Sequence, residues 1–188
     1  MGEEPGVARI VRELNSRGFD VCGVASAKRH DRAVPPANRL RNKEPEADQL
    51  VVVVGHSRGW WGRCLDALAS DPALLERSAP IDAVTEGMLS ATIGALLSAG
   101  EGQAGGWGVR YAHEAAPPSM RDLAIQAGLA SLGPAGLVAH PRWGPWISFR
   151  AAIVTPWHAA HLVRRTITAS VATSGRERAR EGKNTRAG

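Results

Sequence analysis

The sequence predicts an α/β domain in which helices cover both faces of a central sheet. Residues 50–54 are a continuous apolar run, which is typical of a strand that is buried on both faces. Residues 146–155 form a second apolar run, set off by Gly144 and Pro145. Residues 5–17 instead carry their apolar side chains at helical spacing. A chain of 188 residues is long enough to bury the core of one such domain.

Breakers and helix caps divide the chain into the remaining elements of this domain. Glycine and proline clusters separate the segments, and Asp82 stands where a helix N-cap is expected. In chain order the sequence predicts a helix at 5–17, a strand at 19–25, a surface loop at 28–48, a strand at 50–54, helices that start near residues 60 and 82, and a strand at 107–112.

Residues 113–155 contain the most distinctive pattern in the chain. Ser119 is followed three residues later by Asp122, which indicates a helix start. Gly133 and Gly136 enclose a turn that we expect to end this helix. The predicted product is a helix, a glycine-lined loop and a strand, with backbone exposed where side chains are missing. Such a surface suits contact with a large flat ligand.

Residues 122–146, DLAIQAGLASLGPAGLVAHPRWGPW, resemble the signature of the cobalamin-dependent reductases, the family of epoxyqueuosine reductase and the reductive dehalogenases. Two positions depart from the family pattern, because Ala130 replaces a glycine and Pro134 replaces a basic residue. Segments 18–25 and 49–55 also resemble strands of the family, so the resemblance covers residues 5–155. The positions that match as they stand are Leu123, Ala124, Ala127, Gly128, Leu129, Gly133, Gly136, Leu137, Pro141, Trp143, Gly144, Trp146 and Thr155.

The resemblance implies a nitroreductase-like cobalamin-binding domain at residues 1–155, with cobalamin as the cofactor. It also implies a proton donor, because Glu114 stands in the register of the family's acid, ten residues before Ala124. His113 and Tyr111 are alternative donors, and a purely surface role for Glu114 stays open. The residues implied to contact the cofactor are Gly128, Leu129, Gly133, Gly136, Leu137, Pro141, Gly144 and Trp146.

The cysteine content departs from that family. Members carry CxxCxxCxxxCP runs that bind iron–sulfur clusters, whereas this chain has only Cys22 and Cys64, in no metal-binding spacing. A reductase of this kind needs an external electron donor such as ferredoxin or flavodoxin. Its substrate stays open between a small molecule, such as an organohalide, and a modified nucleoside.

Three functions are therefore compatible with the sequence. The resemblance favours a cobalamin-dependent reductase. A non-catalytic cobalamin carrier or processing protein is the first alternative, and a truncated remnant without cofactor is the second. The departures at Ala130 and Pro134 lend the remnant some weight.

Positive charge is concentrated at the end of the chain. Seven of the 23 lysine and arginine residues, but only two of the 18 acidic residues, lie in residues 156–188. The rest of the chain is formally neutral, which argues against nucleic-acid binding by the folded part. We expect residues 156–188 to be a basic, partly disordered tail. The resemblance stops where this tail begins, so a deletion or frame change after Thr155 is one hypothesis for the missing iron–sulfur module.

The loop after the strand at 50–54 holds further candidates, because α/β proteins often bind ligands at strand ends. His56, Ser57 and Arg58 stand there beside Trp60 and Trp61. The favoured alternative is structural: the tryptophans start the next helix and pack on the sheet, and the histidine is a hydrogen-bonded structural residue.

Membrane and metal sites are not expected. No apolar run approaches the roughly 20 residues of a membrane span, and the N-terminus lacks a secretory apolar region, so the sequence predicts a cytoplasmic protein. His158 and His161 have metal-like spacing but stand alone in the predicted tail.

Overall fold

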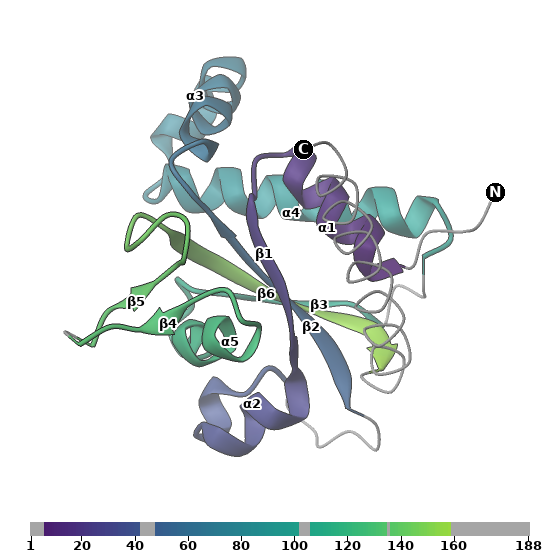
Figure 1. Ribbon diagram of the computed structural model, residues 1–188. Coiled ribbons are helices and arrows are strands. Elements are labelled where there is room, and N and C mark those ends of the chain that lie inside the picture. Colours follow the sequence, from purple (N-terminus) through teal and green to yellow (C-terminus); the bar gives the residue numbers. More distant parts are fainter. Residues whose placement is uncertain (1–5, 42–47, 102–105, 135, 159–188) are drawn as a thin grey trace, which may run out of the picture.

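The central feature of the fold is an antiparallel sheet (Figure 1). The computed structural model describes residues 6–41, 48–101, 106–134 and 136–158. The sheet has the strand order β1-β2-β6-β3, and every neighbouring pair is antiparallel. Its strands are β1 (Val21–Ser26), β2 (Gln49–His56), β6 (Ser148–His158) and β3 (Gly108–Tyr111).

Three helices cover one face of this sheet: α1 (Gly6–Ser16), α3 (Trp60–Ser70) and α4 (Pro80–Ser98). Their buried side chains pack with every second residue of the central strands, because successive residues of a strand point to opposite faces. This larger core cluster contains Ile10, Leu14, Phe19, Val52, Val54, Trp60, Cys64, Val84, Leu89, Leu96, Ala151 and Ile153.

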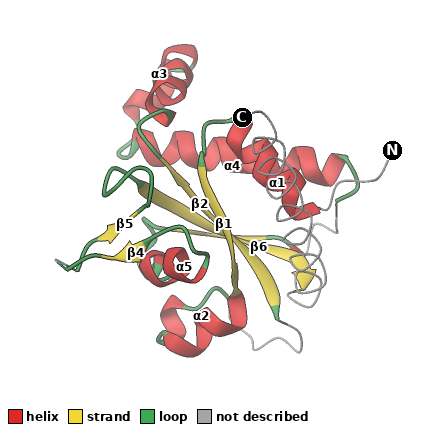
Figure 2. Cartoon of the chain, viewed as in Figure 1, coloured by secondary structure: helices red, strands yellow, loops and turns green. Residues whose placement is uncertain are grey.

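The opposite face is covered by two short helices, α2 (Ala27–Ala33) and α5 (Met120–Gln126). The remaining residues of the central strands point to this side, and the resulting cluster contains Ala25, Ala27, Leu40, Val51, Val53, Leu123, Ala152 and Val154. Figure 2 shows helices on both sides of the sheet. The predicted α/β sandwich and the buried strand at 50–54 are confirmed. The strand predicted at 146–155 begins only at Ser148, its buried part is residues 151–155, and Trp146 is exposed instead of buried.

The end of α5 differs from the prediction. The helix stops at Gln126, well before the Gly133–Gly136 turn. Gly128 takes a left-handed φ of +68°, and the Leu129 amide donates to the Ala124 carbonyl at 2.9 Å. This is the bond that closes a helix with a glycine cap. The chain then forms a small ribbon of β4 (Ser131–Leu132) and β5 (Val138–Ala139).

The segment predicted as a loop at 28–48 also contains regular structure. It includes α2 and a 3-10 helix at Pro36–Asn38. The Ser26 hydroxyl caps α2 by accepting a hydrogen bond from the Arg29 amide at 3.0 Å. The polar composition of this segment predicts a loop, because a helix of only two turns leaves no clear apolar periodicity in the sequence.

Two further differences concern helix starts and the end of the chain. The helix α4 begins at Pro80, so Asp82 lies in its first turn instead of capping it. β6 continues past Thr155 to His158. The rest of the predicted tail, including His161, lies outside the described residues. None of the described helices combines the length and the apolarity that a membrane span requires.

The two-faced core generates a stability prediction. Leu89 is completely buried in α4, so Leu89→Ala leaves a cavity and is expected to lower the free energy of unfolding by about 3 kcal/mol. Leu75, 59% exposed, provides a matched Leu→Ala control that should change it by less than about 0.5 kcal/mol. Urea unfolding followed by circular dichroism measures both. Similar losses in the two variants would contradict the assigned core.

Candidate ligand-binding site

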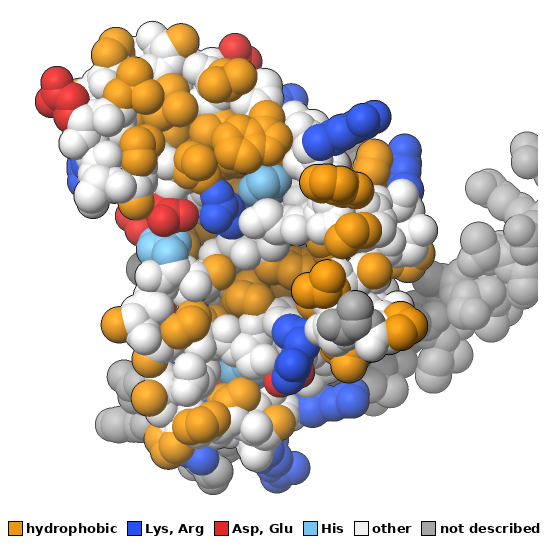
Figure 3. All heavy atoms as spheres, turned by 90° about the vertical axis from the view of Figure 1, so that its left-hand side faces the viewer, with side chains coloured by type: hydrophobic (Ala, Val, Ile, Leu, Met, Phe, Trp, Pro, Cys, Tyr) orange, Lys and Arg blue, Asp and Glu red, His pale blue; other side chains and the backbone are white. Residues whose placement is uncertain are grey.

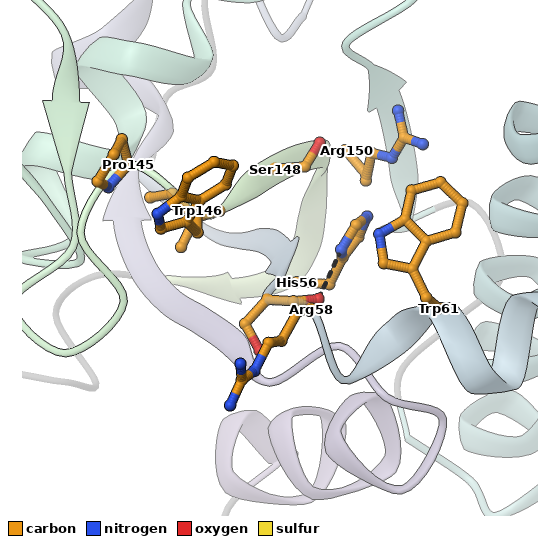
Figure 4. Close-up of a pocket in the computed structure, with 9 residues that line it drawn as sticks. His56, Arg58, Trp61, Pro145, Trp146, Ser148 and Arg150 are labelled. Atoms are coloured by element: carbon orange, nitrogen blue, oxygen red, sulfur yellow. Dashed lines mark hydrogen bonds between the residues drawn. The ribbon is translucent and has the colours of Figure 1, made fainter.

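A pocket of about 240 Å³ lies where β2 ends and β6 begins. The antiparallel register pairs His56 with Ser148, which brings two segments far apart in the sequence to one edge of the sheet. Figure 4 shows Trp61 and Trp146 on opposite sides of this pocket. The lining residues are His56, Ser57, Arg58, Trp61, Pro145, Trp146, Ile147, Ser148 and Arg150.

The loop after β2 is fixed by Asp20. The Ser57 amide donates to Asp20 Oδ1 at 2.7 Å, and the Ser57 hydroxyl donates to Asp20 Oδ2 at 2.5 Å. Both bonds use a charged acceptor, so they are among the stronger hydrogen bonds in proteins. They hold the loop on which Arg58 stands and set the start of α3.

His56 forms part of the pocket floor and is 4% exposed. Its ring stacks on Trp60 with 4.4 Å between centroids, and its Nδ1 lies 3.1 Å from the Ser57 carbonyl oxygen. Burial, with a smaller contribution from the nearby Arg150 charge, lowers the pKa of the imidazole below its usual value. The ring is therefore neutral near pH 7. Because a carbonyl only accepts, Nδ1 carries the proton and Nε2 is left as an acceptor.

Three buried nitrogen atoms in or next to this floor have no hydrogen-bond partner among the described residues. His56 Nε2 and Arg150 Nε belong to residues that line the pocket, whereas Trp60 Nε1 belongs to a fully buried residue that does not line it. The Arg150 guanidinium lies 5.8 Å from the centre of the Trp60 ring, so the three groups belong to one cluster. A buried polar atom without a partner costs about 1–3 kcal/mol, and water or a ligand in the pocket could complete the bonding of the two lining atoms.

The charge of the pocket is positive. Arg58 and Arg150 line it, and no aspartate or glutamate does. Arg150 also lies 3.6 Å from Asp82 on α4, which compensates part of its charge. Among the described residues, the Arg58 side chain has no hydrogen bond or ion pair, and it is exposed.

Apolar side chains are exposed on the same side of the molecule. Trp146 is 80% exposed, and Leu132 and Leu137 of the β4–β5 ribbon are 56% and 66% exposed. Figure 3 shows hydrophobic side chains gathered on this face above and below a hollow. We call Leu132, Leu137 and Trp146 the apolar rim. An apolar rim beside a positively charged pocket is suited to an amphipathic ligand.

The predicted cofactor-contacting glycines take conformations that need glycine. Gly128, Gly136 and Gly144 have left-handed φ values of +68°, +74° and +58°. A Cβ at any of them would meet no other atom within 4 Å, so no neighbouring group requires the missing side chain. Gly133 donates its amide to the Leu137 carbonyl at 2.8 Å, which closes the β4–β5 ribbon. Gly128 and Gly136 are exposed, whereas Gly133 and Gly144 are half-buried, and contact of these glycines with a cofactor stays a prediction.

The other predicted cofactor residues fall in different surroundings. Leu129 packs against β1, because a Cβ at Gly23 would lie 2.8 Å from its Cγ. Pro141 is exposed in a turn whose ends, His140 and Gly144, exchange two backbone hydrogen bonds. Trp146 is the one predicted cofactor residue that lines the pocket.

Glu114 does not line the pocket. Its carboxylate accepts hydrogen bonds from Arg110 Nε at 2.6 Å and from the Tyr111 amide at 2.7 Å. Arg110 also donates to the Ala116 carbonyl at 2.7 Å. The described contacts of Glu114 therefore hold the loop after β3. Its predicted role as a proton donor stays a prediction.

The sequence predicts only part of the pocket lining. The position after a strand makes His56, Ser57, Arg58 and Trp61 candidates, whereas it does not indicate Ser148 and Arg150. The available signal was their spacing in residues 148–150: two polar side chains separated by one residue share a face of an otherwise apolar strand. The structural interpretation of the tryptophans holds for Trp60, which is fully buried, but Trp61 is 46% exposed and lines the pocket.

Neither cysteine belongs to the site. Burial raises the pKa of the Cys22 thiol to about 12, so the thiol stays protonated. Cys64 is buried in the larger core cluster. Within the described ranges, no three His, Cys, Asp or Glu side chains are grouped so that they would hold a metal ion.

Comparisons with known proteins identify a similar fold. No family model matches the chain, and no curated protein matches it in sequence. Among solved structures, the Caenorhabditis elegans B12-trafficking protein CblC, a homologue of human MMACHC, is similar with a TM-score of 0.60 and 14% sequence identity. The match covers 82% of this chain and 71% of that chain. The chain thus has a mixed α/β fold of the kind found in a B12-trafficking protein.

Proposed function

We propose that this protein binds a corrinoid and acts as a carrier or processing protein for it. The observation that carries the proposal is the position of Trp146. This residue belongs to the segment that resembles cobalamin-dependent reductases, it is 80% exposed, and it borders the pocket. A signature residue that is an exposed tryptophan beside a pocket is suited to ligand contact.

Two independent similarities support the same cofactor. The sequence pattern over residues 123–155 resembles proteins that use cobalamin, and the fold resembles that of a B12-trafficking protein. The fold similarity favours carriage or processing over the reductase that the sequence resemblance favoured.

The residues of this face fit a corrinoid. A corrin ring is broad and apolar on its faces, and it carries amide groups at its edge. Leu132, Leu137 and Trp146 offer exposed apolar contact for such a face. The amides of Gly128 and Gly136 already donate to the Ile125 and Gly133 carbonyls, so the exposed backbone at these glycines would offer carbonyl oxygens to edge amides. A bound corrinoid would supply a cobalt centre that changes oxidation state and exchanges axial ligands.

The chain's own residues would bind, orient and shield the ligand. The apolar rim would remove one face of the ring from water, which is the main source of binding free energy for a flat apolar ligand. The Asp20–Ser57 hydrogen bonds keep the neighbouring loop in place before any ligand arrives. Such preorganisation reduces the entropy lost on binding.

Corrinoid binding is tested by titrating the purified protein with hydroxocobalamin and with cob(II)alamin and recording visible absorption. We expect a saturable shift towards the base-off spectrum. Trp146→Ala should weaken binding about tenfold, because one aromatic contact contributes about 1.5 kcal/mol. Leu75→Ala, an exposed residue outside the site, is the control and should bind normally. The absence of any spectral change at high micromolar corrinoid would exclude the proposal.

Carriage and reduction are separated by Glu114→Gln. The described contacts of Glu114 lie away from the pocket, so we expect this variant to bind hydroxocobalamin within about twofold of the unchanged protein. We also expect no turnover of a chlorinated phenol or of epoxyqueuosine when reduced flavodoxin supplies electrons, measured by chromatography. Turnover that Glu114→Gln abolishes without loss of binding would establish the reductase instead.

A further inference from the structure

We propose that the pocket between Trp61 and Trp146 binds a small planar acid, an aromatic molecule that carries a carboxylate or a phosphate group. This ligand is distinct from the corrinoid. The inference goes beyond the proposed function and does not rest on it, because its anion contacts, Arg58 and Arg150, are not used in the corrinoid proposal, although Trp146 borders both sites.

The charge of the lining selects an anion. Arg58 and Arg150 are its only charged residues, and both are cationic. The nearest described carboxylates are engaged elsewhere: Asp20 binds Ser57, and Asp82 lies 3.6 Å from Arg150 on the α4 side. A carboxylate or phosphate entering the pocket therefore meets two positive charges and no acidic lining residue.

Arg58 is the better partner for the anion. Arg150 is shared with Asp82 and is positioned against the Trp60 ring, whereas the Arg58 side chain has no described hydrogen bond or ion pair. Figure 4 shows Arg58 and Arg150 at different ends of the pocket with His56 between them. The Asp20–Ser57 bonds fix the residue directly before Arg58. The Arg58 side chain thus stands on a rigid loop, and its guanidinium is available to a ligand.

The tryptophans select a flat ring. Trp61 and Trp146 border the pocket from opposite sides, and both are exposed despite their large apolar area. Aromatic rings gain from stacked or edge-to-face contact with each other. The pocket volume of about 240 Å³ is that of a small molecule with one or two fused rings, far less than a corrin ring requires.

The pocket floor offers unused hydrogen-bonding capacity. His56 is 4% exposed, lines the pocket and has its Nε2 atom without a partner, while Nε of Arg150, which also lines the pocket, is equally unpartnered. These atoms provide one acceptor and one donor. A ligand with a polar ring atom, or a water molecule held beneath the ligand, would satisfy them.

Isothermal titration calorimetry of the corrinoid-free protein tests the inference at low ionic strength. Two matched pairs serve as probes: indole-3-acetate against its neutral alcohol tryptophol, and AMP against adenosine. We expect at least one anion to bind about tenfold or more tightly than its neutral partner, and the affinity to fall as salt is added. The pair that shows the preference distinguishes a carboxylate from a phosphate ligand.

Two substitutions assign the preference to this pocket. Arg58→Gln should reduce the preference for the anion, so that the anionic probe and its neutral partner bind with affinities within about twofold of each other. The reason is that the variant keeps approximately the side-chain length but removes the charge. Arg63→Gln, which changes an arginine of α3 outside the pocket, should leave it intact. Trp61→Ala should weaken the charged and neutral probes alike.

Equal affinity for charged and neutral partners in both pairs would overturn the inference, and so would a preference that survives Arg58→Gln. The hydroxocobalamin titration is performed separately on the same protein. A failure of the anion site is therefore distinguishable from a failure of corrinoid binding.

Discussion

The antiparallel pairing of β2 with β6 connects the core of this protein to its candidate site. Alternate residues of both strands fill the two core clusters, and after a one-residue register shift between Val54 and Gly55 the pairing places His56 beside Ser148 at the end of the sheet. A one-residue slip would exchange the faces to which every side chain of a strand points. The pocket geometry therefore depends on the core pairing together with the irregularity between Val54 and Gly55.

Hydrogen bonds and charges give this edge of the sheet the character of a binding site. One carboxylate, Asp20, is used to anchor the loop after β2, and another, Asp82, faces Arg150 from α4. The acidic groups therefore support the site from outside, while the lining stays cationic. The buried, neutral His56 contributes an acceptor without adding charge. A positively charged pocket beside an exposed apolar rim unites two kinds of ligand contact on one face.

The sequence predicted the sheet and its layers better than it predicted the site. Strong signals came from long apolar runs such as residues 50–54, whose burial is determined by composition and period. The predicted end of α5, at the Gly133–Gly136 turn, was wrong. The sequence contains several glycines that could end the helix, and the hydrogen bond from the Leu129 amide to the Ala124 carbonyl shows that Gly128 does so. The pocket depends on pairing between residues about ninety positions apart, and a single sequence does not reveal register.

The β4–β5 ribbon has a consequence for the protein in solution. Two strands of two residues each bury little surface, yet they hold Leu132 and Leu137 out towards water. Together with Trp146 these side chains form an exposed apolar patch, through which we expect the ligand-free protein to self-associate at high concentration. A ligand bound there would cover the patch and increase the solubility of the protein. Self-association of the protein in solution is therefore expected to decrease when a ligand covers these side chains.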